Sequence, residues 1–227
     1  MHPVFPNRAA AGRLLAGKLA PTCAGQDGLL VLALPRGGVP VAAEVAHALH
    51  APLDVLVVRK LAAPAHPEFG VGAVASGGLR VLNPHAVEAS GVTRAKLEEV
   101  AARERLEVER RERAYRRGRP PLELRNRPVI LVDDGIATGS TMRVAVAALH
   151  EGWAGSITVA APVATRESYL ELRDQVHGFV VLALPRDFGC VGEYYDDFDQ
   201  TTDAEVRHLL DHAWEERIAV TSGPGAS

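Results

Sequence analysis

The sequence predicts an α/β fold with a mostly parallel central sheet flanked by helices. The first observation is a set of continuous apolar runs, such as LLVLAL at 29–34, which are typical of strands buried on both faces. The second is that segments of helical periodicity follow these runs, as in parallel α/β sheets. The third is that 47% of the 227 residues are hydrophobic, enough for one sizeable core. We expect a single domain over residues 1–220 and a disordered tail over 221–227.

The composition argues against several classes of protein. The formal net charge is -3, from 25 basic and 28 acidic residues, so no overall excess of charge can hold nucleic acid or an anionic membrane. Cys23 and Cys190 lie far apart and lack the spacing of a disulfide scaffold or zinc site. The simplest interpretation is that both are free thiols of a protein in a reducing compartment. The N-terminal residues show no signal peptide, and no run approaches the roughly 20 apolar residues of a membrane helix. We therefore expect a soluble, cytoplasmic protein.

The first half of the chain contains a capped helix, two buried strands and a small hairpin. Asn7 can cap a helix, because its side chain accepts hydrogen bonds from a first helical turn. Residues 61–70 hold two prolines and little periodicity, which predicts a loop. A Ser-Gly-Gly turn at 76–78 predicts a hairpin or a pair of edge strands. The predicted elements are a helix from Asn7 to about Ala20, a strand at 29–34, a helix at 39–50, a strand at 53–58 that ends at Arg59-Lys60, and strands at 71–75 and 79–82.

The second half begins with a long charged helix from Thr93 to Arg117. Its apolar stripe is thin, so we expect it to lie on the surface or along a partner subunit. Its arginines would suit RNA, but interleaved glutamates weaken that interpretation. The prolines at 120 and 121 end the region, since proline disrupts helices. Alternation then resumes, with strands predicted at 128–133, 157–164 and 179–185 and helices at 142–150 and 166–176.

The segment VILVDDGIATGST, residues 129–141, carries candidate chemistry. It places Asp133 and Asp134 at the carboxyl end of a predicted strand, where parallel sheets bind ligands. The residues that follow can turn backbone N–H groups inward, because glycine permits close approach and a helix N-terminus comes next. This loop suits a terminal phosphate, and the two carboxylates suit hydroxyl donors or a divalent cation.

Two other interpretations of this segment stay open. One is an ordinary strand-turn-helix in which an aspartate caps the helix, and the other is the phospho-accepting aspartate cluster of a signalling receiver. A receiver does not need a phosphate-cradling TGST loop directly after its acids. The spacing also differs from a Walker loop and from GxGxxG.

The strand, the Asp-Asp pair and the Ala-Thr-Gly-Ser-Thr loop resemble the 5-phosphoribosyl 1-pyrophosphate (PRPP) motif of the type I phosphoribosyltransferases. The resemblance implies that family's fold, with a core at about 29–184, a small hood at about 185–200 joined by the N-terminal segment, and the charged helix as an insertion. It also implies that Asp133 and Asp134 bind the ribose hydroxyls near a magnesium ion, reached directly or through water. The implied 5-phosphate site consists of Gly135, Ala137, Thr138, Gly139, Ser140 and Thr141.

The same resemblance implies a pyrophosphate site at Pro35, Arg36, Gly37 and Gly38. In relatives this loop often holds a cis non-proline peptide, so the Pro35-Arg36 bond is a candidate. A plain strand-to-helix turn is the alternative. The family also places cations at the end of the second strand, where this chain has Arg59 and Lys60, and a flexible lid where this chain has residues 61–70. Solvated strand-end cations are the other interpretation of that pair.

The segment PRDFGCVGEYYDDF stands where the family's hood receives a nucleobase. Phe188, Tyr194 and Tyr195 could stack on a ring, and Asp187 could accept hydrogen bonds from exocyclic amines. The alternative is that these aromatic side chains fill the hood's own core. Enzymes for 6-oxopurines carry a lysine near the preceding strand, and this chain has Arg166 as its nearest cation, so the acceptor stays open.

The resemblance as a whole implies a magnesium-dependent phosphoribosyltransferase of nucleotide metabolism and salvage. It would transfer 5-phosphoribosyl from PRPP to a nitrogen nucleophile, a nucleobase or related heterocycle, with Asp133, Asp134, Arg36 and Lys60 carrying the catalysis. The alternative is a regulatory protein that senses PRPP or nucleotides without transfer. Partners are expected to be these small molecules and a second subunit in a homodimer, without nucleic acid or membrane.

Overall fold

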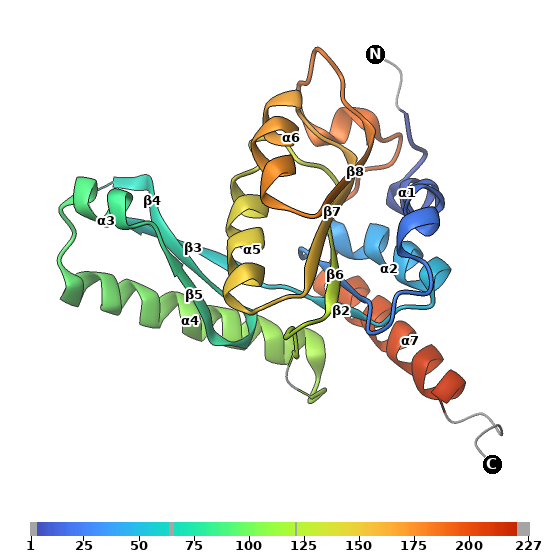
Figure 1. Ribbon diagram of the computed structural model, residues 1–227, viewed down its shortest axis with the longest axis horizontal. Helices are drawn as coiled ribbons and strands as arrows, with labels where there is room; N and C mark the ends of the chain where they lie inside the picture. The colour runs from blue at the N-terminus through green and yellow to red at the C-terminus, as the bar shows by residue number, and fades with distance from the viewer. Residues whose placement is uncertain (1–3, 64–65, 121, 222–227) are drawn as a thin grey trace.

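The computed structural model describes residues 4–63, 66–120 and 122–221. Its main body is a parallel five-stranded sheet in the order β2-β1-β6-β7-β8 (Figure 1). The predicted α/β class and parallel central sheet are therefore confirmed. The strands are β1 (Leu30–Ala33), β2 (Leu53–Val55), β6 (Pro128–Val132), β7 (Ser156–Val163) and β8 (Gly178–Ala183).

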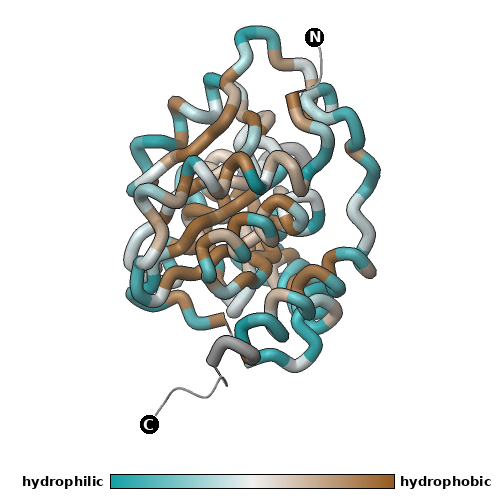
Figure 2. The backbone as a smooth tube through the Cα atoms, turned by 90° about the vertical axis from the view of Figure 1, so that its right-hand side faces the viewer, coloured by the Kyte–Doolittle hydropathy of each residue, from teal (hydrophilic) through white to brown (hydrophobic). Residues whose placement is uncertain are grey.

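Helices cover both faces of this sheet, because its strands are apolar on both sides. Along β1, Val31 and Ala33 face one core, whereas Leu30 and Leu32 face the other. Figure 2 shows these hydrophobic segments crossing the middle of the molecule. The first core is covered by α1 (Arg8–Cys23) and α2 (Gly38–Leu49), and the second by α5 (Ser140–Glu151) and α6 (Arg166–Leu172).

A second, antiparallel sheet extends from the main body (Figure 1). It consists of β3 (Val58–Ala63), β4 (His66–Ala75) and β5 (Leu79–Leu82), with a 3₁₀ turn, η1 (Ser76–Gly78), before β5. The predicted pairing of 71–75 with 79–82 is confirmed. Two other predictions were wrong. The strand predicted at 53–58 ends at Val55, and residues predicted as a loop at 61–70 mostly form β3 and β4, apart from 64–65, which lie outside the described residues.

Local hydrogen bonds explain both corrections. The chain leaves the central sheet after Leu56, whose N–H donates to the carbonyl of Ala33 (3.0 Å). Val57 then exchanges hydrogen bonds with Ser76 of η1, between β4 and β5 of the small sheet, through its N–H (2.8 Å) and its carbonyl (2.9 Å). Pro67 is tolerated in β4 because the paired stretch with β5 starts only at Gly72. Arg59 and Lys60 therefore lie within β3, not at the end of a central strand.

The charged helix forms as predicted, as α4 (Arg94–Arg116), with Thr93 as its cap. A short helix, α3 (Pro84–Ser90), precedes it. The apolar stripe of α4 is buried in this chain's own core, where Leu97 and Val108 join Leu61 of β3 and Val71 of β4. The stripe therefore faces the small sheet of the same subunit, and no partner is needed to cover it.

The C-terminal part includes a helix for which the sequence analysis had no predicted element, α7 (Asp203–Thr221). Its buried Val206 and Leu210 join the core that α1 and α2 cover. Two 3₁₀ turns, η2 (Arg173–Gln175) and η3 (Val191–Tyr194), complete the elements. Of the predicted tail at 221–227, Thr221 ends α7 and 222–227 lie outside the described residues. No helix in the described ranges is long and apolar enough to cross a membrane.

Candidate functional site

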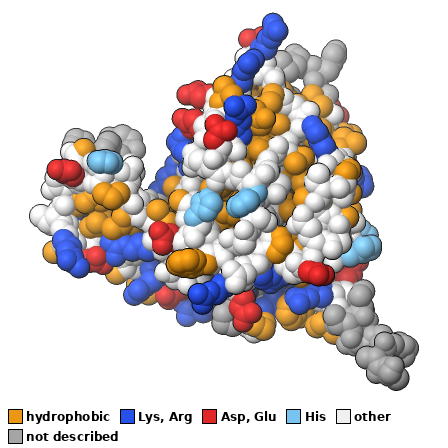
Figure 3. Space-filling view, viewed as in Figure 1, with side chains coloured by type: hydrophobic (Ala, Val, Ile, Leu, Met, Phe, Trp, Pro, Cys, Tyr) orange, Lys and Arg blue, Asp and Glu red, His pale blue; other side chains and the backbone are white. Residues whose placement is uncertain are grey.

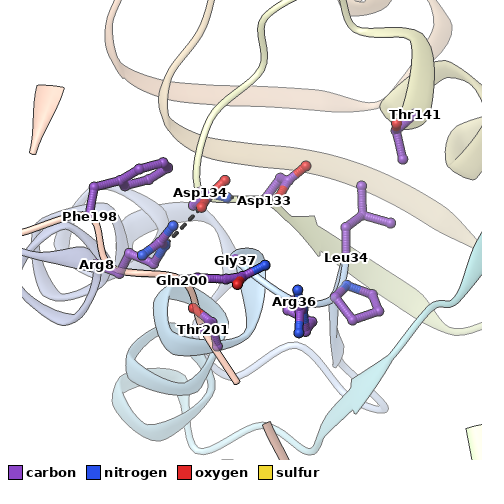
Figure 4. A pocket seen from close by; sticks show the side chains of 11 residues that line it. Arg8, Leu34, Arg36, Gly37, Asp133, Asp134, Thr141, Phe198, Gln200 and Thr201 are labelled. Carbon is purple, nitrogen blue, oxygen red and sulfur yellow. Dashed lines mark hydrogen bonds and ion pairs between the residues drawn. The ribbon is translucent and has the colours of Figure 1, made fainter. Parts of the chain in front are cut away.

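A cavity of about 560 Å³ lies at the carboxyl ends of β1 and β6 (Figure 4). This is the place where parallel sheets bind ligands. The sequence analysis named six of the lining residues as site residues, and it gave the other five no role at the site. The lining residues are Arg8, Leu34, Pro35, Arg36, Gly37, Asp133, Asp134, Thr141, Phe198, Gln200 and Thr201.

The acidic pair directly follows β6 and borders this cavity. The Asp134 carboxylate accepts a hydrogen bond from Nε of Arg8 at 2.8 Å, and both side chains are largely buried. Asp133 turns differently, and its Oδ1 accepts from the backbone N–H of Asp134 at 2.9 Å. Burial raises the pKa of the Asp133 carboxyl well above its usual range, and the negative charge of Asp134 raises it further. The repulsion within the pair is thus relieved by Arg8 on one side and by disfavoured ionisation on the other.

Arg8 is held in place by the hood. Its guanidinium carbon lies 3.8 Å from the ring centre of Phe198, and Nη1 donates to the carbonyl of Asp199 at 2.8 Å. The Tyr195 hydroxyl donates to the backbone carbonyl of Asp134 at 2.6 Å. Burial raises the pKa of Tyr195, so this hydroxyl stays a donor. The N-terminal helix and the hood therefore fix the position of Asp134 together.

The loop after the acidic pair is shaped to receive an anion. Two hydroxyls, of Thr165 (2.8 Å) and Ser168 (2.6 Å), donate to the carbonyl of Ala137 and fix its orientation toward α6. Gly139 takes a left-handed conformation, with φ of 67°, as the cap of α5. In the described part of the chain, no hydrogen bond uses the backbone N–H of Thr138. Free N–H groups at a helix N-terminus suit a phosphate.

The loop after β1 lies opposite the acidic pair. Its Pro35-Arg36 peptide bond is cis, which confirms the predicted geometry. Gly37 packs so tightly against the acidic pair that a Cβ atom there would lie 2.1 Å from Oδ2 of Asp134. Nη1 of Arg36 lies 3.7 Å from Asp203 at the start of α7, and Tyr115 of α4 donates to the same carboxylate at 2.8 Å. The loop thus brings a cation and a close-fitting backbone to the cavity.

Arg59 and Lys60 point to opposite faces of β3, because successive side chains alternate along a strand. Lys60 reaches the anion loop, where Nζ donates to the Ser140 hydroxyl at 2.5 Å. Arg59 instead pairs with Glu104 of α4, with Nε and Nη2 each 2.9 Å from Oε2. The prediction that Arg59 binds pyrophosphate is not supported by this geometry, since its guanidinium is occupied away from the cavity. Lys60 stays a candidate.

The hood aromatic side chains mostly fill the hood's own core. Tyr194 and Tyr195 are 1% and 4% exposed, and both pack with Phe5 of the N-terminal segment. Phe188 stacks on Tyr194 at 5.4 Å. Asp187 is exposed and is not among the residues that line the cavity. These two tyrosines therefore pack in the hood's core. The aromatic ring at the cavity is Phe198, which lies in the predicted hood segment but was not among the residues expected to stack on a base.

The missed lining residues share one property, which is distance along the chain from the motif. Arg8 and Asp134 are 126 residues apart, so no local pattern joins them. Phe198 and Gln200 lie within the predicted hood and Thr201 directly follows it, in an irregular segment to which the sequence analysis gave no site role. The available signal was the expectation that the N-terminal segment joins the hood, and Phe5 does pair there, its N–H donating to the carbonyl of Tyr194 at 3.0 Å.

The acidic pair fits a magnesium ion that arrives with a substrate. Among the described residues there is no group of three or more His, Cys, Asp or Glu side chains that could hold a metal. Magnesium commonly binds through one or two carboxylates, water and substrate phosphates instead of an all-protein cage. Asp133 and Asp134 offer those carboxylates beside a phosphate-binding loop.

The chain is similar to proteins of one family. Residues 5–197 match the phosphoribosyl transferase domain. Proteins from two Mycobacterium tuberculosis strains, CDC 1551 and H37Rv, each provisionally named a phosphoribosyl transferase, are 41% identical over 210 residues. The match covers 92% of this chain and 47% of theirs, so the chain spans about half the length of these curated relatives. The crystal structure of TT1426 from Thermus thermophilus superposes with a TM-score of 0.82 at 44% identity, covering 92% of this chain and 98% of that one.

The family match spans most of the chain and includes the acidic pair, the cis-peptide loop and the anion loop that border the cavity. The relatives of 41% and 44% identity each cover 92% of this chain. The chain therefore belongs to the phosphoribosyl transferase domain family.

Proposed function

We propose that this protein transfers the 5-phosphoribosyl group of PRPP to a nitrogen nucleophile, a nucleobase or a related heterocycle, and releases pyrophosphate. The observation that carries the proposal is the convergence of three elements at one cavity. These are the Asp133-Asp134 pair, the cis Pro35-Arg36 loop and the N-terminus of α5. Their chemistry suits three parts of PRPP, namely the ribose hydroxyls, the diphosphate and the 5-phosphate.

The anion loop and the acidic pair would hold the ribosyl end. The N-terminus of α5 carries positive potential, and the hydroxyls of Thr138 and Thr141 add donors for the 5-phosphate. Asp133 and Asp134 would accept hydrogen bonds from the ribose hydroxyls. In this position they would favour the positive charge that develops on the ribose as the bond to pyrophosphate breaks. The anion loop and the acidic pair would thus hold the sugar at both ends while its anomeric carbon reacts.

Arg36 and Lys60 would receive the diphosphate. Arg36 stands in the loop opposite the acidic pair, and Lys60 reaches from the small sheet to Ser140 of α5. When bound with PRPP, magnesium would help neutralise the charge of the departing pyrophosphate. The nucleophile would attack the opposite face of the anomeric carbon, so that the C–N bond forms as the C–O bond breaks and the configuration inverts.

The acceptor would approach from the hood side of the cavity. Phe198, Gln200 and Thr201 line this side. The guanidinium of Arg8 covers one face of Phe198, and Tyr195 stacks near it at 5.1 Å. An acceptor would therefore meet mainly hydrogen-bonding groups there.

The second candidate function, a sensor that binds PRPP or a nucleotide without transfer, is favoured by one observation. The Asp134 carboxylate, which ribose hydroxyls would need, is already bound by Arg8 at 2.8 Å. If Arg8 keeps this contact when ligand is present, the site would have a weaker anion for stabilising charge on the ribose. Binding could then occur without efficient transfer.

One experiment separates the two functions. The protein, with PRPP and magnesium, is incubated with a panel of purines, pyrimidines and small heterocycles, and pyrophosphate release is measured beside calorimetric binding of PRPP. The transferase requires release that depends on one acceptor class. Tight PRPP binding with no release across the panel would instead support the sensor, and failure to bind PRPP would contradict both.

Neighbouring residues on β3 provide a sharper prediction. Lys60→Ala should lower kcat/KM by about 10- to 100-fold, because a cation aimed at the transition-state charge is lost, with little change in stability. Arg59→Ala should leave kcat/KM nearly unchanged but lower the free energy of unfolding by about 1 kcal/mol, since Glu104 is largely buried and keeps only Arg103. Steady-state kinetics and urea denaturation measure the two effects. Equal loss of activity in both variants would contradict the assignment of the two faces.

Magnesium dependence, assembly as a homodimer, cytoplasmic location and a role in salvage stay predictions. A dimer is compatible with the small sheet and α4, which extend away from the main body (Figure 1). Light scattering on the purified protein measures the assembly state directly.

A further inference from the structure

A second cavity, of about 230 Å³, lies at the opposite end of the central sheet. It is bordered by Leu30 and Leu53 at the amino ends of β1 and β2, by the end of α4, and by α7. In Figure 1 this is the lower end of the sheet, and Figure 3 shows Lys and Arg side chains, interspersed with acidic ones, along the lower edge. Trp214 stands about 16 Å along α7 from Asp203, which is close to Arg36, so the two cavities are well separated.

Arg119 of this second cavity has a buried guanidinium that is only partly hydrogen-bonded. Its side chain is only 6% exposed, and its Nη2 lies 2.9 Å from Asp211. Its Nη1 is buried and has no hydrogen-bond partner within the described structure. A buried guanidinium nitrogen without an acceptor is costly, and such groups are rare in folded proteins. An acceptor group beside Arg119 would remove that cost.

The lining of the cavity carries an excess of positive charge. Arg116, Arg119, Arg127 and Arg217 line it, against the carboxylates of Asp54 and Glu123. Asp54 is already bound by Arg116, whose Nη2 lies 3.0 Å from it.

Arg127 lacks a full anionic partner within this lining. It donates to two neutral carbonyls, of Gly28 (2.8 Å) and Leu29 (3.3 Å), which do not cancel its charge. Burial lowers the pKa of Arg127 and the charge of Arg217 lowers it further, while Glu123 acts in the opposite direction. A bound anion would therefore relieve repulsion between these cations.

Trp214 adds an aromatic wall. The guanidinium carbons of Arg119 and Arg217 lie 5.4 Å and 5.7 Å from its ring centre. Arginines stacked on an indole are kept in one orientation, which leaves less conformational entropy to lose when they bind a ligand. The ring also offers a fluorescent reporter inside the cavity.

We propose that this second cavity binds a small phosphate-bearing molecule, such as pyrophosphate or a phosphate monoester, between Arg119, Arg127 and Arg217. Guanidinium forks match phosphate oxygens in geometry and charge. The volume is below that of usual pockets for drug-sized ligands, so the phosphate group would account for most of the contact. This site is separate from the first cavity, because the two cavities have no lining residue in common.

The test measures the fluorescence of Trp214 in a variant in which it is the only tryptophan. The chain has two tryptophans, so Trp153→Phe leaves one reporter. Titration of this full-length variant with inorganic pyrophosphate should produce a saturable change in fluorescence. Adding Arg217→Ala, an exposed position, should raise the half-saturation concentration at least tenfold, and Arg119→Lys should do the same.

Two controls connect the signal to this cavity. Arg105→Ala changes an exposed arginine on α4 outside the cavity, and Lys60→Ala removes the cation that contacts the anion loop beside the first cavity; neither should shift the titration. Circular dichroism checks that the Arg119 variant is folded, and the Arg217 variant keeps the test valid if it is not. No saturable response, or one that Arg217→Ala leaves unchanged or that Lys60→Ala removes, would overturn the proposal.

Discussion

Replacing Asp133 and Asp134 together by asparagine should lower kcat/KM for phosphoribosyl transfer by roughly a thousandfold or more. Asparagine keeps the size and a hydrogen-bond acceptor but removes the negative charge. The lost activity would therefore come from weaker stabilisation of the positive charge on the ribose and from weaker binding of the metal that accompanies the diphosphate. Pyrophosphate release with PRPP and the acceptor found in the panel measures the effect.

The double variant should remain folded. The fold disfavours ionisation of Asp133, whose pKa burial and Asp134 raise, so a neutral side chain there costs little. Arg8 would lose its ion pair with Asp134 but would keep the carbonyl of Asp199 and the ring of Phe198. Thermal unfolding checks this.

The chain offers a matched control in a second adjacent acidic pair. Asp196 and Asp197 are exposed in the hood and do not line the cavity. Asp196→Asn with Asp197→Asn should leave transfer nearly unchanged. Full activity in the Asp133 and Asp134 double variant, or an equal loss in both double variants, would contradict the assignment.

Gly37→Ala should lower kcat/KM by about 100-fold, the second largest effect expected. The added methyl would lie 2.1 Å from Oδ2 of Asp134, a distance that no real contact permits. Because Gly37 itself has ordinary helical dihedral angles, with φ of -58°, alanine brings no backbone strain of its own. The only relief is for Asp134 to turn away, which breaks its contact with Arg8 and misplaces a carboxylate beside the ribose.

Kinetics and thermal unfolding of Gly37→Ala are compared with Gly17→Ala. A Cβ atom at Gly17, in α1, would meet nothing within 4 Å, so this control should keep full activity and gain slightly in stability. A Gly37 variant with wild-type kcat/KM would show that the close approach of the two loops is not needed for transfer.

Part of this site could be predicted from residues that are neighbours in the chain. The acidic pair and the anion loop lie within 129–141, on one strand-to-helix connection, so their residue types could be read from a single segment. The cis bond at Pro35-Arg36 followed from a resemblance carried by the same short-range features. The buried parallel strands could also be predicted, since strands that are buried on both faces have continuous apolar runs in the sequence.

Predictions failed for side chains whose partners come from segments that are distant in the chain. Arg59 and Lys60 are adjacent, yet Glu104 of α4 binds one and Ser140 of α5 the other, because both lie in β3, where successive side chains point to opposite faces. From the sequence, Tyr194 and Tyr195 suited either stacking on a ligand or packing in the hood's core. The structure decides for packing, because Phe5, from the other end of the chain, lies in the same core cluster as both rings.

The sequence by itself determined the α/β class, the family, and the residues that suit phosphate and ribose, because hydrophobic periodicity and loop chemistry are local properties. Only the tertiary structure decided that Arg8 binds Asp134, that Phe198 is the aromatic side chain at the cavity, and that Arg119 is buried without a full set of acceptors. These facts depend on contacts between segments up to 191 residues apart. Such contacts are set by how helices and sheets pack, and no pattern within a single segment records them.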